Sequence, residues 1–141
     1  MLIHFVRDNS LVSRVIRFFT LSEFSHVAIQ ISSDIWEATM MEGVTRTTLA
    51  EFRDKYPVTV TRKIWVDTAC ATGFLNRQVR KKYDWGGLFG FIAQRDWQNQ
   101  QAWFCSELAA GVIKHCGNSA RKLRVDRVTP RDLFNLIEWA E

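Results

Sequence analysis

Apolar and polar residues alternate through much of the first half of the chain, which is the pattern of half-buried β-strands. The alternating segments are short, rich in Val, Ile and Thr, and bounded by turn residues. We expect strands over residues 2–7, 25–31, 35–39, 44–46 and 58–66. Ser32-Ser33-Asp34 and Glu42-Gly43 are turn sequences between three of these segments, so they predict antiparallel hairpins.

A helical spacing of apolar residues appears once near the N-terminus and then through most of the second half. Ser10 is a good N-cap for a helix that carries Leu11, Val15, Phe18 and Phe19 on one face. Thr129-Pro130 is typical of a helix start, because proline is favoured at the first helical position; that helix runs to about residue 137. The other expected helices cover residues 48–53, 68–82, 88–94 and 104–114.

The order of these elements is strand, helix, a block of strands and then mostly helices. Such segregation favours an α+β fold in which an antiparallel sheet packs against helices. With 141 residues, 47% of them apolar, the chain can bury a real core, and two prolines and seven glycines leave no flexible linker. We therefore expect one domain over residues 1–141.

The net charge of +4 adds little to this picture, because the basic residues are spread along the chain. The densest groups lie at residues 77–82 and 121–124, where solvated surface is the simpler interpretation. The alternative is attraction to an anionic partner such as a cell-wall polymer, lipid headgroups or nucleic acid. No DNA- or RNA-binding motif is recognisable, so we expect no nucleic-acid partner.

The three cysteines are an odd number, which argues against a complete disulfide framework. Cys105 and Cys116 fall on one expected helix, ~16 Å apart and beyond disulfide reach. A reducing compartment fits best. The chain starts with a strand-like segment rather than a signal peptide, and its longest apolar run, 88–93, is too short for a transmembrane segment. We expect a cytoplasmic protein; a phage-encoded protein or non-classical export is the alternative.

Cys105 is the most informative residue for chemistry. It opens the helix that follows Trp103-Phe104, and a helix N-terminus favours the thiolate, which is the nucleophilic form of cysteine. A nucleophilic cysteine needs a base to take its proton, and the base needs a third group to orient it. Taken alone, a single cysteine at a helix start is more often a small buried apolar residue.

His26 is the candidate base and Glu37 the candidate orienting group. They fall on adjacent strands of the first expected hairpin, where cross-strand and diagonal neighbours are ~5 to 8 Å apart, so the carboxylate can touch the imidazole. Each residue has a simpler interpretation, since a strand histidine is often half-buried and satisfied and a glutamate beside a tryptophan is often exposed. The contexts of Cys105, His26 and Glu37 together match a known pattern, which favours the functional interpretation.

Several segments together resemble the circularly permuted branch of the NlpC-type papain-like cysteine peptidases. The nearest group is the YiiX-like proteins, and lecithin retinol acyltransferase-like enzymes are more distant. The resemblance extends from Leu2 to about Phe134 and depends on the order and spacing of its motifs. The segments are Ser25-His26-Val27-Ala28-Ile29, Trp36-Glu37-Ala38 with Gly43-Val44, Tyr83-Asp84-Trp85 and Phe104-Cys105-Ser106-Glu107-Leu108.

The resemblance implies a permuted papain-like fold, in which the histidine precedes the cysteine. It implies Cys105 as nucleophile, His26 as general base and Glu37 as the polar third residue. The acyltransferase-like members usually carry histidine at that third position, so Glu37 favours the YiiX-like group. Substrate or oxyanion contacts are expected from Tyr83, Trp36 and Ser106. For Tyr83 and Trp36, packing of the aromatic ring is the alternative.

The function that follows is a cysteine hydrolase, which cleaves an amide bond through a thioester acyl-enzyme. A peptide or a peptidoglycan stem peptide is the expected substrate. The alternatives are an acyltransferase, thioesterase or lipase with the same three residues, and a non-catalytic binding or assembly module. We expect no cofactor and no metal, because His26, Cys105, His115 and Cys116 lack a standard zinc spacing. The sequence does not indicate an oligomeric state.

Overall fold

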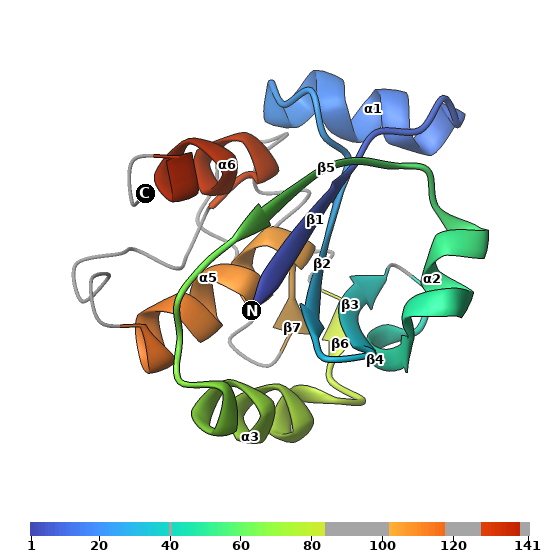
Figure 1. Cartoon of the computed structure of the whole chain (residues 1–141). Coiled ribbons are helices and arrows are strands. Elements are labelled where there is room, and N and C mark those ends of the chain that lie inside the picture. The colour runs from blue at the N-terminus through green and yellow to red at the C-terminus, as the bar shows by residue number, and fades with distance from the viewer. Residues whose placement is uncertain (40, 84–101, 118–127, 139–141) are drawn as a thin grey trace.

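A computed structural model describes residues 1–39, 41–83, 102–117 and 128–138 of the chain. Its centre is a five-stranded sheet in the order β4-β3-β2-β1-β5, with every neighbouring pair antiparallel (Figure 1). β2, β3 and β4 form the two expected hairpins, and β1 lies between β2 and β5. The strands are β1 (Leu2–Val6), β2 (His26–Ile31), β3 (Asp34–Thr39), β4 (Gly43–Thr48) and β5 (Val58–Lys63).

Helices cover both faces of this sheet, as Figure 1 shows. α3, α5 and α6 lie on one face, α2 lies on the other, and α1 lies across one end. A short parallel pair, β6 (Lys82–Tyr83) with β7 (Ala102–Trp103), lies beside β4. The helices are α1 (Leu11–Thr20), α2 (Leu49–Lys55), α3 (Thr68–Gln78), α5 (Cys105–Cys116) and α6 (Pro130–Glu138). The α+β expectation is therefore confirmed, with an antiparallel sheet packed against helices.

The alternation of side chains along the strands divides the apolar residues between two cores. Residues such as Phe5, Ile29 and Trp36 point towards α5 and α6 and form the main core with Leu108 and Leu133. The opposite face carries a smaller cluster, which consists of Val6, Ala28, Ile35 and Phe52, the last from α2. The face with the smaller core has room for polar side chains at the strand ends.

The helix expected over residues 68–82 ends at Gln78, four residues early. The chain turns at Arg80, whose φ is 74°, and then bonds along β4 instead of continuing the helix. The Arg80 N–H donates to the Val44 carbonyl at 2.9 Å, and the Val44 N–H donates to the Lys81 carbonyl at 2.8 Å. Gly43 permits this approach, because a Cβ there would lie 2.1 Å from the Lys81 carbonyl oxygen. These long-range hydrogen bonds outweigh the local preference of this segment for a helix.

Other boundaries differ by smaller amounts. The strand expected to reach residue 66 ends at Lys63, and the short helix expected over 48–53 is α2, for which Thr48 is the N-cap. α5 begins at Cys105 and extends to Cys116, two residues beyond the expected end. α6 begins at Pro130, as predicted. The helix expected over 88–94 lies outside the described residues.

A disulfide joins Cys70 to Cys116, with their Cα atoms 5.7 Å apart. From the sequence only the impossible pairing within α5 was considered, because the contact between the N-terminal turn of α3 and the C-terminal end of α5 depends on tertiary packing. Cys105 is the remaining, free cysteine. Disulfides persist in oxidising environments, so this bond argues against the expectation of a reducing compartment.

Removing this disulfide is expected to lower the free energy of unfolding by about 4 kcal/mol, because the bond closes a loop of 46 residues in the unfolded chain. The Cys70→Ser/Cys116→Ser variant should melt roughly 13 °C lower than the oxidised protein in a thermal denaturation followed by circular dichroism. A reducing agent should produce a similar shift in the native protein and none in the variant. An unchanged melting temperature in both experiments would show that the bond does not form in solution.

Among the helices that the structure describes, none is both long enough and apolar enough to cross a membrane.

Candidate active site

His26 and Glu37 form a close pair on the face of the sheet that carries the smaller core. Glu37 lies opposite Ala28 in the β2–β3 register, so it is a diagonal neighbour of His26 on the same face. Nε2 of His26 lies 2.7 Å from Oε2 of Glu37. The side chains are 13% and 3% exposed, respectively. The contact follows from the hairpin register, as the sequence analysis expected.

Cys105 meets this pair from a distant part of the chain. It is the first residue of α5, which packs against β2 and β3, and it is only 2% exposed. Its side chain shares a hydrogen bond with His26. Because Nε2 of the imidazole is bound to Glu37, Nδ1 is the ring nitrogen left for the thiol. Cys105, His26 and Glu37 thus form a continuous chain of thiol, imidazole and carboxylate.

The electrostatics of the three residues favour a protonated imidazole. Burial favours the neutral ring, but hydrogen bonds from Cys105 and Glu37 and the negative charges on both outweigh burial and raise the pKa of His26 from 6.5 to about 9. The ring is therefore an imidazolium near neutral pH. Reactive cysteines are typically found beside a cation, so this arrangement suits a nucleophile.

Two residues that the sequence analysis missed hold Glu37 in place. Tyr56 shares a side-chain hydrogen bond with Glu37, and its ring centroid lies 5.0 Å from that of His26. Nζ of Lys55 lies 3.8 Å from Oε1 of Glu37. Phe52 and Tyr56 are four residues apart and in ring contact, which is the one sequence signal that α2 faces this site.

These neighbours keep Glu37 ionised although it is buried. Burial acts to raise the pKa of this carboxyl, but the hydrogen bond and charge of His26, the charge of Lys55 and the bond from Tyr56 together lower the pKa below 4.5. Burial and the nearby Glu37 charge raise the pKa of Tyr56, so the phenol stays protonated and donates its hydrogen bond. Glu37 can therefore orient His26 without exchanging protons itself.

The N-terminus of α5 supplies backbone donors next to the thiol. Phe104 is the N-cap, and its own N–H donates to the Glu107 carboxylate at 3.2 Å. The N–H groups of the first turn of a helix have no partner within the helix, and Cys105 lies in that turn. They can therefore hold an oxyanion that forms on a carbonyl attacked by Cys105.

The other candidate residues from the sequence are placed differently. Trp36 is 1% exposed in the main core, and its Nε1 donates to Oδ1 of Asn76 at 3.3 Å. Ser106 is fully buried, and its hydroxyl donates to the carbonyl of Val128. The Trp36 side chain therefore packs in the core, which was its alternative interpretation, and the Ser106 hydroxyl is bonded within the fold. Tyr83 pairs with Trp103 through the backbone, and its side chain lies outside the described residues.

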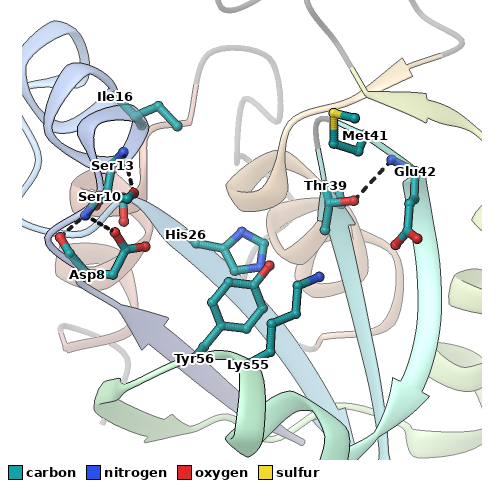
Figure 2. Close-up of a pocket in the computed structure, with 12 residues that line it drawn as sticks. Asp8, Ser10, Ser13, Ile16, His26, Thr39, Met41, Glu42, Lys55 and Tyr56 are labelled. Carbon is teal, nitrogen blue, oxygen red and sulfur yellow. Dashed lines mark hydrogen bonds between the residues drawn. The ribbon is translucent and has the colours of Figure 1, made fainter.

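A cavity of about 370 Å³ opens beside His26 (Figure 2). Its walls come from the start of α1, from β2, from the β3–β4 turn and from the end of α2. Polar and apolar side chains both line it, and Cys105 is not among the lining residues. The labelled lining residues are Asp8, Ser10, Ser13, Ile16, His26, Thr39, Met41, Glu42, Lys55 and Tyr56.

The remaining described histidines and cysteines do not join this site. His4 is buried and bonded through both ring nitrogens, to Thr61 at 2.8 Å and to Gln30 at 2.7 Å. Cys116 is in the disulfide. Within the described ranges, no three potential metal ligands gather closely enough to hold an ion. The site offers nucleophilic chemistry from its own side chains.

A comparison with models of known protein families finds no match to this chain. A comparison with curated proteins finds no significant match either.

Proposed function

We propose that this protein is a cysteine hydrolase that cleaves an amide bond, with Cys105 as nucleophile, His26 as general acid and base, and Glu37 as the residue that orients His26. The observation that carries the proposal is the continuous chain of thiol, imidazole and carboxylate, in which Nε2 of His26 lies 2.7 Å from Glu37 and the thiol opens a helix. Burying polar groups costs free energy, so packing alone does not favour such an arrangement.

The reaction would begin when Sγ of Cys105 attacks the carbonyl carbon of the substrate. The carbonyl electrons move onto oxygen, and N–H groups at the start of α5 bind the resulting oxyanion. The tetrahedral intermediate collapses, the C–N bond breaks, and the His26 imidazolium gives its proton to the leaving amine. The product of this half-reaction is a thioester between Cys105 and the acyl group.

Water completes the cycle. The neutral His26 takes a proton from water, the hydroxide attacks the thioester, and the C–S bond breaks. The acid product leaves, and the Cys105 thiolate and the His26 imidazolium are restored. Glu37 remains a carboxylate throughout and holds the Nε2–H side of the ring.

The arrangement supports the permuted papain-like fold that the sequence suggested. The base and its orienting residue come first, on β2 and β3, and the nucleophile follows at the start of a helix packed on the same sheet. The resemblance implies such a site, with the histidine before the cysteine in the chain as in the permuted branch. We therefore include this fold and its YiiX-like branch in the proposal.

The cavity supports a peptide as substrate. Its rim carries carboxylates on Asp8 and Glu42, the ammonium group of Lys55 and several hydroxyls. A peptide, such as a stem peptide derived from a cell wall, presents amino, carboxyl and amide groups that these side chains can bind. A volume of about 370 Å³ falls within the usual range of small-ligand sites.

One observation favours a second candidate, an enzyme that cleaves lipid esters or thioesters with the same three residues. Leu11 and Phe18 on α1 and Met41 in the β3–β4 turn are large apolar side chains that are largely exposed, and Met41 lines the cavity. Turnover of acyl esters with none on muropeptides would select this candidate. Turnover of muropeptides with none on acyl esters would select the amidase.

Alkylation of Cys105 tests the site itself, because Cys105 is the free thiol left beside the disulfide. At neutral pH, iodoacetamide should modify Cys105 at least about tenfold faster in the native protein than in His26→Ala, since the imidazolium favours the thiolate. Mass spectrometry of the intact chain follows the reaction. His115→Ala is the matched control, because His115 is exposed and on the opposite end of α5, and its rate should equal that of the native protein.

Equal alkylation rates in the native protein and in His26→Ala would contradict the proposed site. The third possibility, a binding or assembly module that does not use catalysis, would then gain support.

A further inference from the structure

α1 presents a row of large apolar side chains to solvent. Leu11 is 75% exposed, Val15 45%, Phe18 73% and Leu21, directly after the helix, 75%. The spacing of 11, 15 and 18 places the first three on one side of the helix. We call Leu11, Val15, Phe18 and Leu21 the α1 stripe. Clusters of large, exposed apolar side chains often mark interaction surfaces.

The opposite side of α1 is fixed to the body of the protein. Ile16, Ser13 and Thr20 are buried, and the Ser13 hydroxyl donates to the Asp8 carbonyl at 2.9 Å. Ser13 and Ile16 also line the cavity beside His26, as Figure 2 shows. α1 lies at the margin of the molecule in Figure 1. The stripe is therefore the outward side of a helix whose inward side borders the candidate active site.

Arginines accompany the stripe. Arg14 is exposed on one flank of α1, and Nη1 of Arg131 donates to the Leu21 carbonyl at 3.2 Å, which places a second arginine at the end of the helix. The acidic residues nearest in sequence are Asp8 and Glu23, one before and one after the helix. The helix itself carries two arginines and no acidic residue, on a chain with a net charge of +4.

We propose that the α1 stripe docks onto the surface of an anionic lipid bilayer. Leu11, Val15, Phe18 and Leu21 would enter the boundary between headgroups and acyl chains. Arg14 and Arg131 would face the lipid phosphates. A short helix with an apolar side and a cationic flank fits a membrane interface, where apolar burial and attraction to anionic lipids act together.

The size of the stripe favours a bilayer over a second protein. A stable protein interface engages about 20 to 30 residues on each side, whereas the stripe has four side chains on a helix ~15 Å long. A bilayer needs only shallow insertion of such a helix. Docking in this way would also bring the cavity that α1 borders close to the lipid surface.

The test is co-sedimentation of the full chain with vesicles. Vesicles of phosphatidylcholine mixed with phosphatidylglycerol should bind at least about tenfold more protein than vesicles of phosphatidylcholine alone, and the difference should shrink at high salt. Leu11→Ser/Phe18→Ser should lose most of the binding to the mixed vesicles. Arg14→Glu should also bind less to the mixed vesicles than the native chain does.

Trp65→Ser is the matched control. Trp65 is 82% exposed, and Nζ of Lys63 lies 4.7 Å from its ring centroid, so it offers an apolar side chain with a cation away from α1. This variant should bind as the native chain does. Equal losses in Trp65→Ser and Leu11→Ser/Phe18→Ser would overturn the proposal, and so would full binding by the double variant.

Two further outcomes separate this proposal from its rivals. Absence of vesicle binding together with a dimer that Leu11→Ser/Phe18→Ser dissociates would overturn it and assign the stripe to a second copy of the chain. Cys105→Ala should bind vesicles as the native chain does. Absence of hydrolysis would therefore not contradict membrane docking, and absence of vesicle binding would not contradict the proposed hydrolase. Circular dichroism of each variant verifies that the fold is retained.

Discussion

Replacing Cys105 with serine should reduce the rate of substrate hydrolysis by at least about a thousandfold while leaving the fold intact. Serine is nearly the same size as cysteine, so the buried start of α5 keeps its packing. An alcohol is ionised far less than a thiol, and a site whose imidazole is already protonated cannot take the proton of a hydroxyl. The measurement is kcat/KM on the substrate that the native protein turns over, with thermal denaturation of both proteins.

Cys70→Ser/Cys116→Ser is the control for this experiment. It removes the other two cysteine sulfur atoms and the disulfide, yet these lie at the opposite end of α5 from Cys105. Its melting temperature should fall while kcat/KM, measured well below that temperature, stays near the native value. If Cys105→Ser retained native activity, the thiol would not be the nucleophile. If the double variant lost activity without unfolding, the disulfide would have a role in the chemistry that we do not assign to it.

Glu37→Gln should lower the pKa of His26 from about 9, because the carboxylate supplies part of the charge and hydrogen bonding that raise it. The loss of kcat/KM near neutral pH should be on the order of a hundredfold or more, since a glutamine cannot stabilise the imidazolium. The alkaline limb of the pH–rate profile should move to lower pH in the variant. An NMR titration of the His26 ring measures the same change directly.

The stability of the fold should follow the same groups. The folded pKa of His26 is raised above 6.5, so its contribution is fully present below pH 6.5 and is lost as pH rises through about 9. The folded pKa of Glu37 is lowered, so its contribution is present above about 4.5 and is lost as pH falls through the lower folded value. The native protein should therefore exceed Glu37→Gln in melting temperature most clearly between these limits.

Glu51→Gln is the matched control for the pH experiments. Glu51 also accepts hydrogen bonds, from Thr47 and Thr48 at the start of α2, and these lower its pKa to about 2. It is exposed and does not contact His26. Its pH–rate profile should match that of the native protein. A Glu37→Gln profile that also matched it would rule out the carboxylate as the partner that sets the charge of His26.

Local patterns in the sequence were enough to predict the pair of His26 and Glu37. A tight turn between two alternating strands fixes the register, and the register sets which side chains meet. The same alternation also predicts that Trp36, as the neighbour of Glu37, points to the opposite face. The sequence analysis did not draw this conclusion when it placed Trp36 among the substrate contacts.

The parts that could not be predicted depend on contacts between distant segments. α3 ends early because Arg80 and Lys81 bond to Val44, which comes more than thirty residues before them. Cys70 meets Cys116 only because α3 packs against α5. Tyr56 reaches Glu37 from the end of α2, whose position on the sheet is not visible in its own sequence. The spacing of these residues along the chain therefore could not predict their contacts.

The separation of the three residues along the chain makes Cys105 a reporter of folding. His26 and Glu37 are eleven residues apart and belong to one hairpin, so they can meet early by closing a short loop. Cys105 joins them only when α5, which begins 79 residues after His26, docks on the finished sheet. A chain arrested before that step holds the base and its partner without the nucleophile. The rapid reaction of the thiol would then arise with the last tertiary contacts, and its onset during refolding would time the docking of α5.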